Sequence, residues 1–298
     1  MRLRALAARG AANGLHGLEL LDHQGIQEHE PAARGLLGLW VPETALLDYR
    51  LVALALKRRL RQLDVQFALG RGVTSIREEG SWVRTASATG PVEGRWLVNC
   101  AGLQAELLAR SAGLETGLRI IAFRGDYYEL APSLAEQVRS TIYPVPTARW
   151  DFNRRRSSRP LSTTRNSHPL WTDKRGPVRV TAGPNAVLAL AREGYRRRDV
   201  SVGYITSLLG YTGMRRLAGR YFKTALGETW RDLSKRSYAR AVAAYLPGVT
   251  HRDLMPGPSG VRAHAVAPDG TLLDDFRLIR QGSVVNVLNA PLRPPPHA

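Results

Sequence analysis

Apolar residues in the first third of the chain recur with a helical period and then form short runs typical of strands. Asp48 is a suitable N-cap, and an apolar face follows it at every third or fourth position. This face comprises Tyr49, Val52, Leu56, Leu60 and Leu63. Apolar runs bounded by glycine-containing turns predict strands at 65–67, 73–76, 82–85 and 95–99.

From about residue 114 the chain is richer in aromatic and β-branched residues, which favour antiparallel strands. We predict strands at 120–130, 141–145, 178–182, 271–276 and 283–288. Helical spacing predicts helices over 187–197 and 228–246. The stretch 256–262, with its glycines and prolines, predicts a flexible turn.

The sequence Asn99-Cys100-Ala101-Gly102 ends one predicted strand and leads into a predicted helix. A buried strand that ends in a small-residue turn lets an α/β sheet approach the phosphates and ribose of a nucleotide closely. Cys100 is the only cysteine, which excludes an internal disulfide. We expect its side chain to be a small buried group at the strand end.

Four further motifs follow this turn in order. They are Phe123-Arg124-Gly125-Asp126-Tyr127-Tyr128, Ile142-Tyr143-Pro144-Val145-Pro146, Gly183-Pro184-Asn185-Ala186-Val187 and Gly257-Pro258-Ser259-Gly260-Val261-Arg262-Ala263. Together the five motifs resemble the L-2-hydroxyglutarate oxidase/dehydrogenase family of FAD-dependent oxidoreductases, in the D-amino-acid-oxidase-like class. The resemblance spans most of residues 13–291.

The resemblance implies an α/β fold with two domains. One is an FAD-binding Rossmann-like domain of the D-amino-acid-oxidase type, formed by 43–115 and 256–298. The other is an antiparallel-sheet substrate domain at 116–255, with an irregular basic insert at 149–176, and 1–42 would be a remnant of its first segment. Residues 95–99 and 284–288 should therefore lie in the same sheet layer.

Family members begin with a strand and a G-x-G-x-x-G turn, and no such turn occurs in these 298 residues. The chain opens on a sequence that resembles the middle of a family member, so we expect an N-terminal βαβ unit to be missing. We therefore expect this chain to be an inactive fragment that binds FAD poorly.

The resemblance implies oxidation of L-2-hydroxyglutarate to 2-oxoglutarate, with hydride transfer to FAD and electrons passing to oxygen or a quinone. It also implies a cytoplasmic protein in peripheral contact with the inner membrane. Two alternatives stay open. The chain could be another 2-hydroxy-acid or amino-acid oxidase of this fold, or a non-catalytic remnant that binds polyanions through 149–179.

The resemblance assigns six residues to the cofactor, although each also has an ordinary structural explanation as a core, turn or strand residue. They are Val73, Ala101, Gly102, Gly260, Arg262 and Asn289. Val73 would touch the adenine from a strand of the same sheet as 95–99. Arg262, placed by its glycine-led turn, would also bind the substrate carboxylate.

A dicarboxylate substrate needs a guanidinium fork and phenolic donors when it is enclosed near a flavin. Arg124, Tyr127 and Tyr128 offer these groups, with Arg124 and Tyr128 on one strand face and Tyr127 on the other. The alternative is a surface arginine packed on tyrosine rings. By resemblance Asn185 is a further polar pocket residue, and otherwise a turn former.

No catalytic base can be named from this sequence, because the family's most suitable histidine lies in the segment that is lacking here. His264 shares the expected face of Arg262, but the family more often has glutamine there. We expect His16, His23 and His29 to be exposed and without partners. No spacing of His, Asp or Glu suggests a metal site.

The net charge of +18 could indicate nucleic-acid binding, but two features argue against specific recognition. Only four of the 43 basic residues are lysine, which is typical of GC-rich coding. The charge is also concentrated at 149–179, where nine basic residues face only Asp151 and Asp173. This segment has neither helical nor strand periodicity, and we expect irregular structure at 154–175.

Overall fold

The structure is a computed structural model that describes residues 2–45, 48–143, 162–166, 179–220, 234–273 and 275–290. The chain forms two compact units. Unit 1 comprises Met1–Val65, Asp126–Asn185 and Thr224–Pro258, and unit 2 comprises Gln66–Gly125, Ala186–Lys223 and Ser259–Ala298. The division into cofactor and substrate domains stays a prediction, since compactness alone assigns no ligand to either unit.

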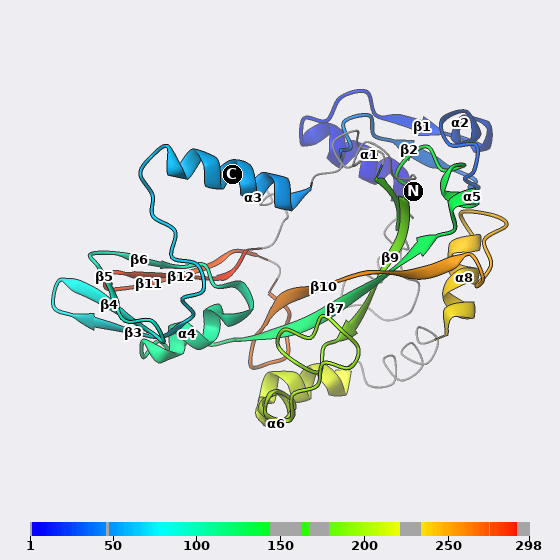
Figure 1. The fold of residues 1–298 in the computed structure, drawn as a ribbon. Coiled ribbons are helices and arrows are strands. Elements are labelled where there is room, and N and C mark those ends of the chain that lie inside the picture. Colours follow the sequence, from blue (N-terminus) through cyan, green and yellow to red (C-terminus); the bar gives the residue numbers. More distant parts are fainter. Residues whose placement is uncertain are drawn as a thin grey trace. The chain divides into compact units, whose positions relative to one another are not determined.

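The largest sheet has the strand order β10-β7-β9-β8, and three of its strands contribute residues to both units (Figure 1). The strands are β7 (Arg119–Leu130), β8 (Ser162–Asn166), β9 (Arg179–Leu188) and β10 (Leu254–Val266). The predicted strands at 120–130 and 178–182 are therefore confirmed. Strand β8 pairs antiparallel with β9 inside the segment predicted to be irregular, so that prediction is wrong at 162–166. The backbone hydrogen bonds between two strands do not require alternating apolar residues. The two threonines in the sequence of β8 also favour a strand.

Unit 1 begins with α1 (Arg2–Ala12), β1 (Glu19–Leu21), α2 (His23–His29) and β2 (Gly38–Trp40), with β1 and β2 antiparallel. Helix α3 (Tyr49–Arg61) follows its predicted N-cap, because Asp48 Oδ1 accepts from Arg50 N at 2.7 Å. Its predicted apolar face is not buried in the structure. The described residues of unit 1 also form helices α5 (Pro132–Ala135) and α8 (Lys235–Ala243).

The core of unit 1 joins α8 to the large sheet. Tyr238, Ala239 and Val242 on one face of α8 pack with Leu130 and Val180 of the strands. This face recurs at helical spacing, and most of the basic residues of α8 lie outside it. Helix α8 confirms part of the helix predicted at 228–246; residues 228–233 lie outside the described residues.

Unit 2 contains two three-stranded sheets with helix α4 (Ala105–Ser111) between them. One sheet has the order β3 (Val73–Glu79), β4 (Trp82–Ser87) and β5 (Val92–Gly94), and it is antiparallel. The other has the order β11 (Arg277–Gln281), β12 (Val284–Asn289) and β6 (Leu97–Asn99). Ile76 and Val83 of the first sheet, Val284 of the second and Leu108 of α4 pack in one cluster.

Strands β6 and β12 pair in parallel, with Asn286 opposite Asn99, which confirms that 95–99 and 284–288 share a sheet. A parallel pair separated by most of the chain, together with antiparallel hairpins and several helices, confirms the α/β class. None of the helices in the described ranges is long and apolar enough to cross a membrane.

Several local predictions are wrong. Residues 65–67 and the described part of 271–276 form no strand, and the closing hairpin begins at β11 instead. Residues 189–200 follow β9 without a helix; α6 (Val202–Gly210) and a helical stretch at 212–220 come later. Short apolar runs are ambiguous in sequence because their structure depends on which partners they meet.

Cys100 and His29 also differ from expectation. Cys100 is exposed, because strand alternation points Asn99 inward and the residues on either side of it outward. His29 is half-buried, and its ring stacks on Trp40 at 4.2 Å between centroids. Of the predicted strand at 141–145, only 141–143 lie within the described residues, with Ile142 in a bridge. The other predicted basic and C-terminal segments, 149–161, 167–178 and 291–298, lie outside the described residues.

Candidate cofactor and substrate site

The turn after β6 is built around the side chain of Asn99. Its Nδ2 donates to the carbonyl of Ala105 at 2.8 Å and to Asn286 Oδ1 at 2.9 Å, and its Oδ1 accepts from Ala101 N at 3.2 Å. Asn99 is 4% exposed, so these bonds are shielded from water. One amide thereby fixes the strand end, the turn and the start of α4 together.

Gly102 occupies the position in this turn that needs glycine. Its φ is +56°, in the left-handed region that side chains disfavour. A Cβ there would meet no atom within 4 Å, so conformation rather than crowding requires the glycine. Ala101 and Gly102 are both exposed, which leaves the backbone open to a ligand. The structure is thus compatible with the predicted cofactor contact at these two residues.

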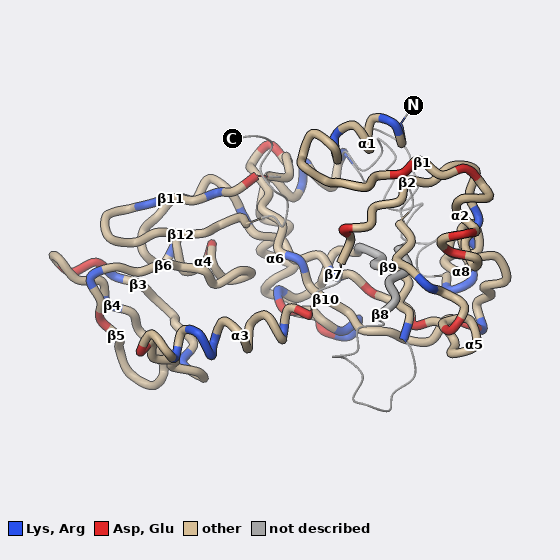
Figure 2. The backbone as a smooth tube through the Cα atoms, turned by 90° about the horizontal axis from the view of Figure 1, so that it is seen from above, with Lys and Arg blue, Asp and Glu red and all other residues tan. Residues whose placement is uncertain are grey.

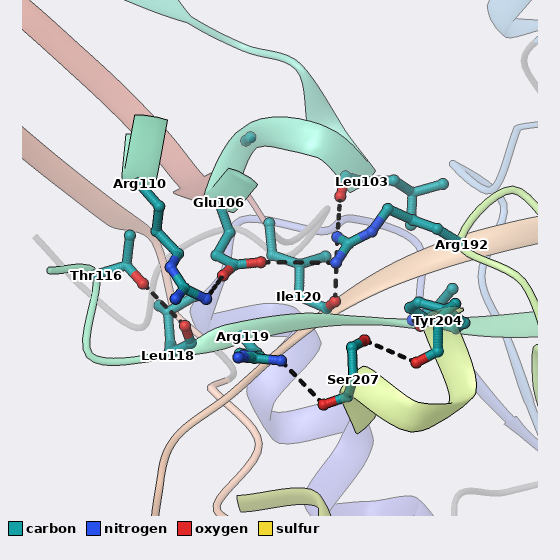
Figure 3. A network of polar contacts seen from close by, with 12 residues as sticks. Leu103, Glu106, Arg110, Thr116, Leu118, Arg119, Ile120, Arg192, Tyr204 and Ser207 are labelled. Carbon is teal, nitrogen blue, oxygen red and sulfur yellow. Dashed lines mark hydrogen bonds and ion pairs between the residues drawn. The ribbon is translucent and has the colours of Figure 1, made fainter. Parts of the chain in front are cut away.

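Helix α4 carries a buried carboxylate beside this turn (Figure 3). Glu106 is fully buried, with Oε1 3.2 Å from Arg110 Nη1 and Oε2 3.7 Å from Arg192 Nη2. Arg192 also donates to the carbonyl of Leu103 at 2.6 Å and lies over the ring of Tyr204. Sequence reasoning missed this network; its signal was a charged pair, Arg192-Glu193, directly after an apolar strand.

Two tyrosine hydroxyls, from the buried Tyr204 and the half-buried Tyr211, make further polar contacts in this region. Tyr204 Oη accepts from the backbone N–H of Ala122 at 2.8 Å, and Tyr211 Oη donates to the carbonyl of Val266 at 2.8 Å. Burial raises the pKa of Tyr204 above its ordinary value of 10.0, although the hydrogen bond and the charge of Arg192 oppose this. Burial likewise raises the pKa of Tyr211.

Residues 256–262 lie in the long strand β10, so the prediction of a flexible turn there is wrong. Arg262 is exposed, and no hydrogen bond or ion pair joins its side chain to another described residue. Ser259 Oγ donates to the carbonyl of Tyr195, and His264 meets Phe123 edge-on at 5.1 Å. Arg262 therefore presents a solvated guanidinium from a fixed strand rather than from a loop.

Arg124 is buried, with 7% of its surface exposed, and it is neither a surface arginine nor a free one. Its Nη1 donates to the carbonyl of Arg196 at 3.0 Å. Because Ser259 bonds to the adjacent Tyr195 carbonyl, strands β7 and β10 both hold the segment at 195–196. The structure thus gives Arg124 a clear structural contact, and its predicted role toward substrate stays a prediction.

The two tyrosines of β7 have different surroundings. Tyr128 packs on Tyr238 of α8 at 4.7 Å between ring centroids, against the core of unit 1. Tyr127 is flanked by glycines: a Cβ on Gly183 would lie 2.8 Å from its ring, and one on Gly257 would lie 2.8 Å from its carbonyl oxygen. The glycines of both motifs therefore allow close packing at Tyr127.

The other predicted site residues are dispersed. Val73 starts β3, which belongs to a different sheet from β6, so the expectation of one shared sheet is wrong. Asn289 Nδ2 donates to the carbonyls of Leu273 and Asp275 at 2.9 and 2.7 Å. Asn185 lies on β9, and its side chain is outside the described part of the structure. Within the described residues, no three His, Cys, Asp or Glu side chains gather where they could hold a metal ion.

The basic and acidic residues are scattered along the described backbone (Figure 2). Several are engaged with neighbours: Arg84 pairs with Glu93 at 3.5 Å, and Arg280 lies over the ring of Trp96 at 4.7 Å. The concentrated charge at 149–179 lies almost wholly outside the described residues.

Comparison with solved structures identifies the fold. The structure matches an L-α-glycerophosphate oxidase of Mycoplasma pneumoniae with FAD bound, with a TM-score of 0.66 and 16% identity over 96% of this chain and 63% of that one. It also matches a glycine oxidase of Geobacillus kaustophilus, with a TM-score of 0.57 and 13% identity over 96% and 61% of the two chains. At these identities the likeness concerns the fold alone.

Sequence comparison gives nearer relatives. The L-2-hydroxyglutarate dehydrogenase of Escherichia coli K12 is 37% identical over 97% of this chain and 65% of its own length. The protein of that name from Indibacter alkaliphilus is 33% identical over 97% and 69%. The human mitochondrial one is 32% identical over 92% and 59%. The chain thus spans about 65% of the length of the first of these relatives.

A model of the FAD-dependent oxidoreductase family, DAO, matches residues 1–289. The match includes the Asn99–Gly102 turn, the glycines beside Tyr127 and Arg262 on β10. The chain belongs to the FAD-dependent oxidoreductase family of the DAO type.

Proposed function

We propose that the residues of this chain serve the FAD-dependent oxidation of L-2-hydroxyglutarate to 2-oxoglutarate. The observation that carries the proposal is the 37% identity to L-2-hydroxyglutarate dehydrogenase over nearly the whole chain. The turn whose backbone Asn99 fixes and the exposed guanidinium of Arg262 support it, since the reaction needs a cofactor contact and a carboxylate anchor.

The residues at the turn fit a flavin nucleotide. Gly102 leaves open space where a side chain would project, and Asn99 fixes the backbone of Ala101. When bound, FAD would supply the acceptor for the hydride removed from the carbinol carbon. Ala101 and Gly102 would contact it through their backbone, with Gly260, Val73 and Asn289 as the remaining proposed cofactor residues.

Arg262 is the proposed anchor for a substrate carboxylate. An exposed guanidinium on a rigid strand can form two parallel N–H···O bonds to a carboxylate and so orient the carbinol carbon. Arg124, Tyr127, Tyr128 and Asn185 are the other proposed substrate residues. His264 packs against Phe123 and is not proposed as the base.

The proposal also includes the electron acceptor and the cellular location of the reaction. We infer a quinone acceptor, reached from the cytoplasm by peripheral contact with the inner membrane. Oxidation of L-2-hydroxyglutarate under argon, with a short-chain quinone as the electron acceptor and no artificial dye, would support this. Oxidation that occurs only with oxygen as the acceptor would contradict it.

Substrate discrimination tests the proposal. The chain would be assayed with excess FAD, alone and fused to the G-x-G-x-x-G segment of the E. coli relative, using L-2-hydroxyglutarate, D-2-hydroxyglutarate and glycine. We expect oxidation of the L-isomer alone by the fusion. Oxidation of glycine, or a flavin-loaded fusion inert toward all three, would contradict the proposal.

Arg262→Met in the same fusion should raise KM for L-2-hydroxyglutarate by roughly 10–100-fold, since a charge-assisted pair with the carboxylate is lost. Arg77→Met is the matched control, because Arg77 is an exposed strand arginine on β3. A KM unchanged by Arg262→Met would remove this residue from the substrate site.

A further inference from the structure

Arg192 and Glu193, two consecutive residues after β9, hydrogen-bond to the segment 99–104. This segment is called the cofactor turn below. Arg192 Nη1 donates to the carbonyl of Leu103 at 2.6 Å. Gln104 Nε2 donates to Glu193 Oε1 at 2.9 Å. Two adjacent residues, Arg192 and Glu193, therefore bond to two adjacent residues of the turn, Leu103 and Gln104. The two pairs are 89 positions apart in sequence.

Glu106 fixes the orientation of Arg192 (Figure 3). Its fully buried Oε2 makes no hydrogen bond within the described residues, and the guanidinium of Arg192 lies 3.7 Å away. A buried carboxylate needs a nearby positive charge, so Arg192 is held in place on this side. The ring of Tyr204, 5.5 Å from the guanidinium carbon, borders it as well.

We infer that Arg192 is a positioning residue for the cofactor turn, and this inference rests on the proposed function of that turn. Glycine can adopt many backbone conformations, so the turn at Gly102 depends on contacts that order it, and the Leu103 carbonyl lies between Gly102 and α4. A charged donor fixed by Glu106 sets the direction of that carbonyl and so restricts the turn to one conformation. A turn already ordered loses less conformational entropy when FAD binds.

Arg119 provides a matched control for a merely structural arginine. Its Nη1 donates to the carbonyl of Ser207 at 3.0 Å, and it lies over the ring of Tyr211 at 5.2 Å. It thus shares two kinds of contact with Arg192, a hydrogen bond to a carbonyl and a position over a tyrosine ring, whereas Arg192 also pairs with Glu106. None of these contacts reaches the cofactor turn.

Hydrogen exchange of the Gln104 amide tests the inference without any cofactor, because this N–H donates to the Ala101 carbonyl at 3.0 Å inside the turn. In the full chain, Arg192→Met should lower its protection at least about tenfold, with the amides of β3 and β4 unchanged. Arg192→Lys should restore part of the protection, and Arg119→Met should leave it unchanged. An unchanged Gln104 amide, or equal losses in Gln104 and β3, would overturn the inference.

FAD titration of the same substitutions in the fusion that carries the G-x-G-x-x-G segment, followed by flavin fluorescence, is the second measurement. We expect Arg192→Met to raise the Kd for FAD about tenfold and Arg119→Met to leave it unchanged. Equal FAD affinities of Arg192→Met and the fusion without substitutions would overturn the inference. If the fusion without substitutions takes up no FAD, the proposed cofactor function fails, and the exchange measurement still decides the role of Arg192.

Discussion

At the residue scale, a few polar side chains determine the geometry of unit 2. Asn99, Glu106 and Asn286 are at most 4% exposed, and each contacts a neighbour distant in sequence or in the adjoining helix. Asn286 Nδ2 has no hydrogen-bond partner among the described residues, so this buried pair is not fully satisfied. Such groups cost stability when a partner is removed and specify one arrangement when it is present.

Replacing Asn99 with alanine should lower the free energy of unfolding by about 2–4 kcal/mol, because buried groups on Ala105 and Asn286 lose their donor. Urea denaturation measures the change. Ser111→Ala, which removes an exposed hydroxyl from α4, should change it by less than about 0.5 kcal/mol. Equal effects of the two substitutions would contradict the role given to Asn99.

Gly183→Ala should destabilise the protein by about 1–3 kcal/mol, since its Cβ would lie 2.8 Å from the Tyr127 ring at a φ of +152°. Gly260→Ala is the matched control on β10, where no atom lies within 4 Å of the new methyl group. Thermal unfolding compares the two. A Gly260→Ala protein as unstable as Gly183→Ala would show that strand flexibility, not close packing, requires glycine.

At the scale of elements, a helix and a strand are joined by hydrogen bonds between a side chain of one and a backbone group of the other. The N–H of Ala122 on β7 donates to the hydroxyl of Tyr204 on α6, and Arg119 of β7 donates to the carbonyl of Ser207 on the same helix. These bonds join α6 to β7 within unit 2. The apolar cluster of Ile121, Ala122 and Leu208 packs around them.

The Tyr204 contact predicts a loss of stability at alkaline pH. Burial raises the pKa of Tyr204 in the folded state, so above about pH 10 the unfolded chain loses its phenolic proton before the folded chain does. The folded state then binds more protons, and the free energy of unfolding falls as pH rises through the folded pKa. Tyr204→Phe should show a shallower decline between pH 9 and 11, measured by urea denaturation at each pH. If the free energy of unfolding declines equally in Tyr204→Phe and in the unsubstituted protein, other groups cause the decline, and Tyr211 is the first of these to test.

At the scale of the whole molecule, cofactor affinity is the property most open to test. The sequence contains no G-x-G-x-x-G turn, whose N–H groups would stabilise a pyrophosphate by on the order of 4–8 kcal/mol. We expect the 298-residue chain to purify without flavin absorbance at 450 nm and without 2-hydroxyglutarate oxidation. Fusion to the missing motif should restore absorbance, and a fusion with its glycines replaced by valine should not. Stoichiometric FAD in the unfused chain would contradict this expectation.

The sequence by itself determined the elements whose signals are local. Asp48 begins α3 because its side chain can cap a helix, and the β-branched run at 120–130 forms β7 because such residues favour strands. The motifs also identified the family, and Asn99–Gly102 was recognised as a turn because small residues follow an apolar strand there; the φ of +56° at Gly102 agrees with this.

Only the tertiary structure decided what depends on distant partners. Strand β10 replaced a predicted turn because Gly257 lets its backbone lie against Tyr127, and Val73 entered a separate sheet because β3 pairs with β4. The Glu106–Arg192 pair could not be predicted, since its partners are 86 positions apart and the charged pair Arg192-Glu193 does not indicate which residue it meets. Local periodicity records the propensity of a segment, whereas burial and ion pairing arise only when segments remote in sequence meet.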